Sequence, residues 1–272
     1  CQKTSLLFNP HRLDTKTSNS KKSVYRAISD DKFLSGLARV ILYKRSPKGI
    51  KYKDMLYQCL SINISGVQYV NEFPPKKAAD LYDTYNVGSE SRVLDPCAGW
   101  GGRMIGASRS NCKYIAFEPS TRTFKGLINL SEFINTMNKG FVSEVNCTPF
   151  EESNIKDNTF DFAFTSPPYF DTEQYCEEST NSFNKFKTFQ EWVDGFYFPL
   201  IKKTMDALKP NKTFVLNIGS RKYPLNELLI NEFGSVYDIK IGKEKLQGKS
   251  GLKVSEKEGE TFYHITKNQP QQ

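Results

Sequence analysis

One short motif in this chain combines residue types that could hold a flat substrate. It is Ser-Pro-Pro-Tyr at residues 166–169, and it follows an apolar run. Proline fixes φ, so the carbonyl groups of this turn can be held in one direction. The serine hydroxyl and a proline carbonyl could accept two N–H groups of a planar, nitrogen-bearing substrate, while the tyrosine ring stacks on its face. The alternative is a rigid surface turn, because two prolines after a buried strand are also common in loops.

A second motif could hold a nucleotide-like cofactor. Asp95 ends an apolar run, and a glycine-rich turn, Gly-Trp-Gly-Gly at 99–102, follows. Glycines let a backbone approach a ligand closely because no Cβ intervenes. The turn lacks both the Gly-x-Gly-x-x-Gly spacing of dinucleotide sites and the Gly-Lys-Ser/Thr of triphosphate sites, so a cofactor without phosphates fits better. By itself the turn could also be a tight connection without a ligand. Glu118, at the end of the next apolar run, favours the cofactor, because an acidic residue there binds ribose hydroxyls.

Alternating strands and helices from about residue 73 would position both motifs. We expect strands at 92–95, 114–117, 141–146, 160–165 and 213–218, a closing hairpin of 236–241 with 261–266, and helices at 103–108, 119–135, 189–208 and 225–233. This alternation predicts an α/β fold, in which a mostly parallel, seven-stranded sheet carries helices on both faces. Ligands of such sheets bind beyond the carboxyl ends of the strands, where both motifs lie.

The first 65 residues predict a small, basic, partly helical extension. Residues 15–23 are polar and indicate a flexible or partner-bound segment, whereas 31–45 and 54–60 have helical spacing. We therefore expect an extension at 1–65, a catalytic domain at 66–268 and a tail at 269–272.

Composition limits the class of protein. The chain has 272 residues and is 38% apolar, as packed globular proteins are, and no apolar run approaches the ~20 residues that span a membrane. Its six cysteines form no Cys-x-x-Cys pair and it has two histidines, so we expect no metal site. Scattered thiols indicate an intracellular setting, in the cytoplasm or nucleoid, or in the nucleus of a eukaryote.

In their order, these motifs resemble those of the S-adenosylmethionine-dependent DNA methyltransferases that modify exocyclic amino groups of bases. The resemblance covers about residues 70–268 and implies a Rossmann-like methyltransferase fold with S-adenosylmethionine as cofactor. It implies that Glu118 binds the ribose and that the turn at 147–150, which departs from the family's Gly-Asp-Ser-like pattern, flanks the adenine. The implied cofactor-binding residues are Phe73, Pro74, Asp95, Cys97, Ala98, Gly99, Gly101, Glu118, Pro119, Thr148 and Phe150. Phe150 could instead be a core aromatic.

The resemblance also implies a reaction. A methyl group would pass directly from the sulfonium to an exocyclic amine of cytosine or adenine, with the base flipped out or already unpaired. Serine at the first position of the turn is more common among cytosine-N4 enzymes, which favours cytosine N4 over adenine N6. Cysteine attack on carbon 5 of cytosine is disfavoured, because Cys97 belongs to the glycine turn and is expected to be a small packed residue. The implied base-holding residues are Ser166, Pro167, Pro168 and Tyr169.

Two other functions stay open at this point. Enzymes of the same fold that act on RNA or on a protein glutamine also hold a planar group with an X-Pro-Pro-Tyr turn, although they usually begin it with Asn or Asp. A methyltransferase fold could also serve as a non-catalytic binding subunit, since fold does not determine function.

The net charge of +8 favours a polyanionic partner, here DNA. The expected phosphate contacts are in two lysine-rich segments, although a solvated face could have the same composition. Phosphate contacts carry no sequence information, so a sequence reader would lie in residues 1–65, an interior loop or another subunit. A homodimer, the target sequence and a role in restriction-modification stay open. The residues expected to contact phosphates are Lys44, Arg45, Lys48, Lys245 and Lys249.

Overall fold

The computed structural model describes residues 4–18, 20, 22–43, 67, 70–219, 222–242 and 261–267. Contacts divide the chain into two compact units, each considered by itself. The first comprises Cys1–Asn9, Glu72–Tyr169 and Glu178–Gln272, and the second comprises Pro10–Asn71 and Phe170–Glu177. The domain boundary expected between residues 65 and 66 stays a prediction.

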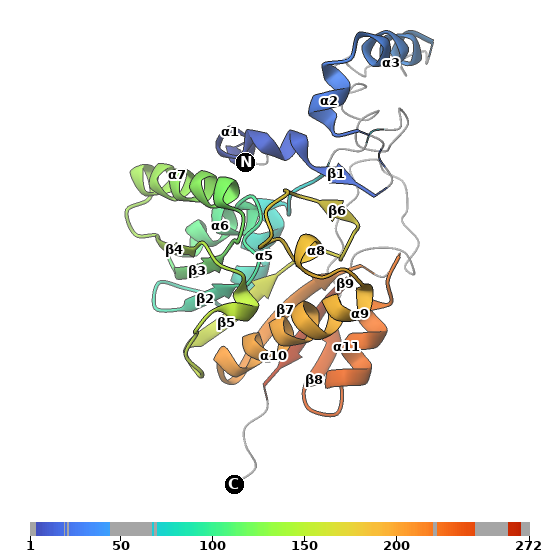
Figure 1. Ribbon diagram of the computed structural model, residues 1–272. Helices are drawn as coiled ribbons and strands as arrows, with labels where there is room; N and C mark the ends of the chain where they lie inside the picture. The colour runs from blue at the N-terminus through green and yellow to red at the C-terminus, as the bar shows by residue number, and fades with distance from the viewer. Residues whose placement is uncertain are drawn as a thin grey trace. The chain divides into compact units, whose positions relative to one another are not determined.

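A seven-stranded sheet forms the centre of the first unit, in the order β4-β3-β2-β5-β7-β9-β8. Neighbouring strands from β4 to β7 are parallel, and β9 pairs antiparallel with both β7 and β8. This confirms the predicted α/β fold, with its mostly parallel sheet and antiparallel closing hairpin (Figure 1). The strands are β2 (Arg92–Asp95), β3 (Lys113–Phe117), β4 (Val142–Asn146), β5 (Phe160–Thr165), β7 (Leu208–Ile218), β8 (Asp238–Ile241) and β9 (Thr261–Thr266).

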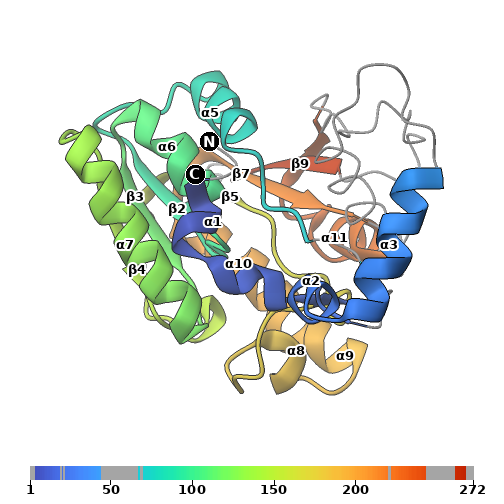
Figure 2. The same cartoon turned by 90° about the horizontal axis from the view of Figure 1, so that it is seen from above.

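Helices cover both faces of this sheet, which explains its apolar central strands. β3 is buried after its first residue, and β5 is buried except at Asp161, as expected for parallel strands covered on both sides. None of the helices in the described ranges has the length and apolar character needed to cross a bilayer. One face carries α5 (Pro75–Thr84), α6 (Gly102–Ala107) and α7 (Thr121–Met137), and the other carries α10 (Phe198–Ala207) and α11 (Leu225–Phe233) (Figure 2).

Two elements differ in detail from their predicted form. The helix expected at 189–208 consists of α9 (Phe189–Trp192), a π-helical segment (Val193–Tyr197) and α10. Pro199 thereby lies in the first turn of α10, where its missing N–H is tolerated. β7 begins at Leu208 rather than at residue 213, because Leu208 already pairs with β5.

Residues at the start of the chain belong to the first unit, which the sequence did not predict. Phe8, in α1 (Thr4–Phe8), packs against Phe133 of α7 with ring centroids 5.4 Å apart. Asn9 is fully buried, and its Nδ2 donates to the carbonyl of Trp100 at 3.3 Å. A Cβ on Gly126 would lie 2.1 Å from Asn9 Oδ1, so glycine makes room for this contact.

The second unit contains short elements of the N-terminal extension. Where they are described, residues 15–23 have defined structure, unlike the flexible or partner-bound segment expected there. The hydroxyls of Thr17 and Ser20 are 2.7 Å apart, and Ser23 caps the next helix, so local hydrogen bonds satisfy these polar residues. The helix expected at 54–60 lies outside the described residues. The elements are η1 (Pro10–Asp14), β1 (Lys16–Thr17), α2 (Val24–Ile28), α3 (Asp31–Tyr43) and β6 (Glu173–Gln174), which pairs antiparallel with β1.

Helices α5 and α6 approach each other closely at Gly106. A Cβ on this residue would lie 2.6 Å from the Cβ of Ala78 and 2.8 Å from the carbonyl oxygen of Pro75. Since α6 begins directly after the glycine-rich turn, this contact also determines where the turn lies against α5.

Gly106→Ala is therefore expected to force the two helices apart and to destabilise the protein by about 1–3 kcal/mol, the usual range for an overpacked core. The free energy of unfolding in denaturant measures this. Gly88→Ala is the matched control, because nothing lies within 4 Å of a Cβ at Gly88. Equal stability of the two variants would contradict the close approach.

Candidate active site

The two motifs lie beside each other because their strands are neighbours. β2 ends at Asp95, β5 ends at Thr165, and the two strands pair in parallel. Both turns therefore leave the carboxyl edge of the sheet, where open α/β sheets bind ligands.

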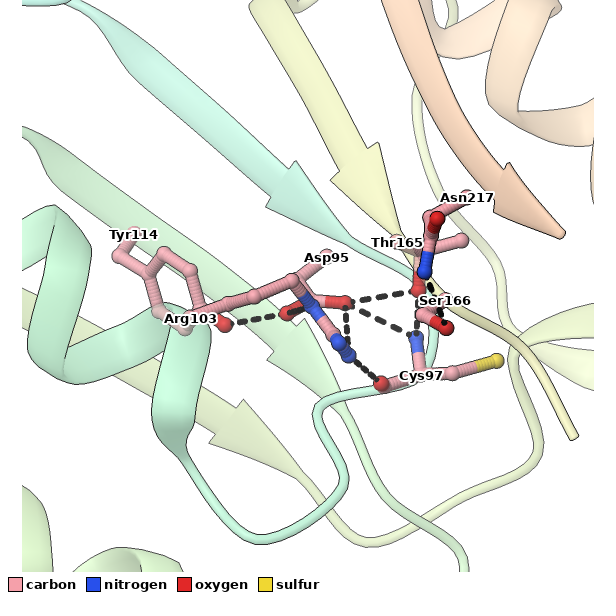
Figure 3. Close-up of polar contacts among 7 residues, drawn as sticks. All are labelled: Asp95, Cys97, Arg103, Tyr114, Thr165, Ser166 and Asn217. Atoms are coloured by element: carbon pink, nitrogen blue, oxygen red, sulfur yellow. Dashed lines mark hydrogen bonds and ion pairs between the residues drawn. The ribbon is translucent and has the colours of Figure 1, made fainter. Parts of the chain in front are cut away.

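A buried ion pair links the two turns (Figure 3). Arg103 Nε donates to Asp95 Oδ2 at 2.8 Å, and its Nη2 donates to Oδ1 at 3.2 Å. The Thr165 hydroxyl donates to Asp95 Oδ1 at 2.9 Å and accepts from the backbone N–H of Cys97 at 3.1 Å. The Tyr114 hydroxyl donates to Asp95 Oδ2. Side chains and backbone from both turns therefore meet at one carboxylate.

This position changes the role expected for Asp95. Its side chain is fully buried and both carboxylate oxygens are bound by the protein, so it organises the turn from inside rather than contacting a cofactor directly. Burial lowers the pKa of Arg103. The charge of Asp95 and its hydrogen bonds raise this pKa by more than burial lowers it, so the net result is a pKa above the usual range. Arg103 therefore stays charged. Arg103 was not among the predicted site residues, although a basic residue directly after a glycine turn could have indicated it.

The glycine turn is closed on one side and open at Gly99. Gly99 and Gly101 have φ values of +55° and +92°, in the left-handed region that favours glycine. A Cβ on Gly101 would lie 2.4 Å from Leu130 Cδ2, and one on Gly102 would lie 2.1 Å from the carbonyl oxygen of Phe73. The nearest atom to a Cβ on Gly99 would be the Cys97 carbonyl oxygen, at 4.0 Å. Gly99 is thus the point of the turn that a cofactor can approach.

Glu118 lies directly beside this turn. Its carboxylate accepts from the backbone N–H of Ser120 at 3.0 Å and from that of Gly99. Burial raises the pKa of Glu118 to about 8; the two backbone donors oppose the rise, and the charges of Asp95 and Glu178 add to it. A carboxylate held next to an open glycine fits the ribose of an adenosyl cofactor.

The residues around this point differ in exposure. Phe73 and Pro74 precede α5 and are partly exposed, and the Phe73 ring lies edge-on to Phe164 with centroids 5.0 Å apart. Ala98 is buried, and its backbone N–H donates to the carbonyl of Phe117 at 2.9 Å, which ties the turn to β3.

Cys97 is partly exposed and its thiol is not activated. Burial raises the pKa of this thiol well above its usual value, and the charge of Asp95 adds to the rise. A protonated thiol is a weak nucleophile. This agrees with the expectation that cysteine attack on a base is disfavoured.

The turn after β4 also reaches the site. The backbone N–H of Glu118 donates to the carbonyl of Asn146 at 3.0 Å, which brings residues 147–150 next to the end of β3. Thr148 is partly exposed there, as Pro119 is. Phe150 is 2% exposed and packs edge-on against Phe117, with ring centroids 5.0 Å apart. Its position fits the alternative role, a core aromatic.

Two further residues near the site had no predicted role. The Glu178 carboxylate accepts from the backbone N–H of Thr121 at 3.1 Å and from its hydroxyl at 3.0 Å, so it caps α7, which follows the Glu118 turn. Asn217, on β7, contacts both Ser166 and Tyr169 of the Ser-Pro-Pro-Tyr turn. In that turn Ser166, Pro168 and Tyr169 are partly exposed, and Pro167 is buried.

The predicted phosphate contacts cannot be placed on this site. All of them lie outside the described residues, so their role stays a prediction. They are Lys44, Arg45, Lys48, Lys245 and Lys249.

A family model described as DNA methylase matches residues 160–272, from β5 through the Ser-Pro-Pro-Tyr turn to the end of the chain. This match confirms the resemblance to the amino-methyltransferases and identifies S-adenosylmethionine as the cofactor. The matched residues and the fold are those expected of an S-adenosylmethionine-dependent methyltransferase.

Several solved structures are similar to this chain at low sequence identity. A tRNA (m1A58) methyltransferase from Aquifex aeolicus is 12% identical over 82% of this chain and 89% of its own, with a TM-score of 0.49. An rRNA methylase from Streptococcus thermophilus is 14% identical over 73% of this chain and 98% of its own, with a TM-score of 0.45. These likenesses are too distant to bear on the substrate. No curated protein sequence matches this chain.

Arg103→Met leaves the buried charge of Asp95 without its partner. We expect it to destabilise the protein by about 3–5 kcal/mol, as the loss of one member of a buried pair does. Denaturant unfolding is the measurement. The control is Arg109→Met, because the ion pair of Arg109 with Asp83 has side chains that are 65% and 47% exposed, and its loss is expected to cost less than ~1 kcal/mol. Similar losses of unfolding free energy in both variants would show that the buried pair contributes no more stability than the exposed one.

The raised pKa of Glu118 predicts that cofactor affinity depends on pH. Ribose hydroxyls donate to the ionised carboxylate, and with a pKa of about 8 this form is about tenfold less common than the acid at pH 7. Affinity should therefore rise about tenfold from pH 7 to pH 9, where the carboxylate is mostly ionised. Calorimetric titration with S-adenosylhomocysteine, which carries the same ribose, measures this.

Glu118→Gln is the control for that titration. Its side chain cannot ionise, so any remaining pH dependence belongs to the ligand or to other groups. We expect a nearly flat profile and weaker binding than wild type at pH 9. If the two proteins gave parallel profiles, Glu118 would not be the group that titrates.

Proposed function

We propose that this protein transfers the methyl group of S-adenosylmethionine to an exocyclic amino group of a DNA base, with cytosine N4 favoured over adenine N6. The observation that carries this proposal is the position of the Ser-Pro-Pro-Tyr turn directly beside the glycine turn, because β5 and β2 are paired neighbours. The family match over residues 160–272 supports the same class of substrate.

The chemistry requires the protein to hold a weak nucleophile in place. The lone pair of an exocyclic amine is delocalised into the ring, so the amine reacts poorly unless it is oriented. Ser166 Oγ and the carbonyl of Pro167 would accept its two N–H groups, which localises the lone pair toward the methyl donor. Alignment of this kind can supply up to ~7–11 kcal/mol of the barrier reduction.

The cofactor side of the site would hold the methyl donor against that amine. Bound S-adenosylmethionine supplies an electrophilic methyl group on its sulfonium. The open backbone at Gly99 and the carboxylate of Glu118 would hold its adenosyl part, and Phe73 and Pro74 its methionine end. The Asp95–Arg103 pair would hold the two turns together, because Asp95 also accepts a hydrogen bond from the Thr165 hydroxyl at the end of β5.

Tyr169 would stack on the base. Its hydroxyl donates to the Asn217 carbonyl at 3.4 Å, which restricts the ring at its far end. A base inside a duplex cannot enter a site of this kind, so the target nucleotide would be flipped out or already unpaired. The phosphate contacts in the lysine-rich segments, an additional subunit for target recognition and a homodimer remain parts of the proposal.

The test is methyl transfer from labelled S-adenosylmethionine to unmethylated genomic DNA, with RNA and protein in parallel and the modified nucleosides identified by mass spectrometry. We expect 4-methylcytosine. A 6-methyladenine product would overturn the choice of base and keep the class. Label only in RNA or protein would overturn the DNA substrate. Cofactor binding without any transfer would indicate a non-catalytic subunit.

Substitutions in the turn test the roles of its residues. We expect Ser166→Ala and Tyr169→Ala each to lower kcat at least about tenfold, the equivalent of one lost hydrogen bond or stacking contact. Binding of S-adenosylhomocysteine should change little. Ser29→Ala is a control, because the hydroxyl of Ser29 is exposed and bonds only within its own turn, to the Tyr25 carbonyl. Unchanged kcat in both turn variants would refute the assignment.

A further inference from the structure

Asn217 contacts two residues of the Ser-Pro-Pro-Tyr turn from the neighbouring strand. It lies one residue from the end of β7, and the residue before it, Leu216, pairs with Thr165 at the end of β5. Its Nδ2 donates to Ser166 Oγ at 3.2 Å, and Figure 3 shows the amide facing this hydroxyl. Its backbone carbonyl accepts from the Tyr169 hydroxyl at 3.4 Å.

The direction of the hydrogen bond from Asn217 to Ser166 determines which further hydrogen bonds the Ser166 hydroxyl can make. A serine hydroxyl has one hydrogen to donate and two lone pairs to accept with. The N–H of Asn217 takes one lone pair and thereby sets the orientation of the oxygen. One lone pair remains for an N–H of a substrate amine.

Burial makes Asn217 a stable support for the turn. Its side chain is fully buried, as are its neighbours Leu216 and Ile218, whereas Ser166 and Tyr169 are partly exposed. A buried amide N–H is rarely left without a partner, because its desolvation costs free energy. The contact with Ser166 is therefore favoured in the folded protein, and it is made from a rigid strand to a turn at the site surface.

We propose that Asn217 is the positioning residue of the base-holding turn. It orients the Ser166 hydroxyl through its side chain and the Tyr169 ring through its backbone, and it does not touch the substrate itself. This inference rests on the proposed function, because it concerns the residues assigned to hold the amine. A side-chain substitution removes the contact with Ser166 and keeps the backbone contact with Tyr169, so we expect its effect on turnover to pass through Ser166.

Two variants test this directly. Asn217→Ala removes the donor, and Asn217→Asp keeps the size and shape of the side chain but replaces the donor with an acceptor. We expect both to lower kcat about 10–100-fold, with affinity for S-adenosylhomocysteine within about twofold of wild type. A general disturbance of the sheet would lower kcat and would also weaken the binding of S-adenosylhomocysteine. Wild-type kcat in Asn217→Asp would overturn the proposal, since a donor would then be unnecessary.

A double variant separates positioning from general structure. If Asn217 acts through Ser166, adding Asn217→Ala to Ser166→Ala should lower kcat by less than about threefold more. Full additivity of the two losses would overturn the proposal. Thr213→Val is the matched control on the same strand, because it removes a hydroxyl contact with Thr266 away from the turn. It should keep wild-type kcat.

A readout without turnover makes the inference independent of the substrate. Hydrogen exchange of the peptide containing residues 165–169 should be faster in Asn217→Ala than in wild type and Thr213→Val. If the wild type modifies RNA or protein rather than DNA, the proposed function fails, and the kcat comparison is made with that substrate instead. If it transfers no methyl group, exchange decides: unchanged exchange in Asn217→Ala overturns the role of Asn217.

Discussion

The buried ion pair of Asp95 and Arg103 is the interaction on which the rest of the site depends. A carboxylate in an apolar core is costly unless it is paired and its remaining lone pairs accept hydrogen bonds. Here the partners come from three elements: Arg103 from α6, Tyr114 from β3 and Thr165 from β5. The charge is fully paired only when groups from all three elements converge, so the buried core and the two turns stabilise each other. The shape of the site is therefore determined by buried side chains beneath the two turns.

The sequence predicted most of the fold because its strands are apolar runs separated by glycine, proline and acidic residues. It predicted the two acidic strand ends equally well, but not their different roles. Asp95 and Glu118 both follow apolar runs, and nothing local shows that the first faces a buried arginine while the second lies beside an open glycine. Phe150 presented the same difficulty, since an aromatic residue after a strand can line a ligand or fill a core.

The residues that the sequence analysis missed act across long separations. Asn217 reaches Ser166 from 51 positions along the chain. Which side chain of β7 faces the turn depends on register, and the pairing of β5 with β7 contains an irregularity between Phe160 and Phe162. A shift of one residue would put an apolar neighbour of Asn217 opposite the serine. Register is a property of two strands together, and a single stretch of sequence does not encode it.

The contact of Asn9 with Trp100 has a consequence for how the chain acquires its activity. The two residues are 91 positions apart, and Gly126 on α7 completes the seat for Asn9. Asn9 is synthesised long before either of them, so it cannot dock until β2, β3 and α7 have emerged from the ribosome. A contact between residues so far apart requires the closure of a long loop, which costs conformational entropy. A partly made chain that lacks α7 therefore has no complete seat for Asn9 beside the glycine turn.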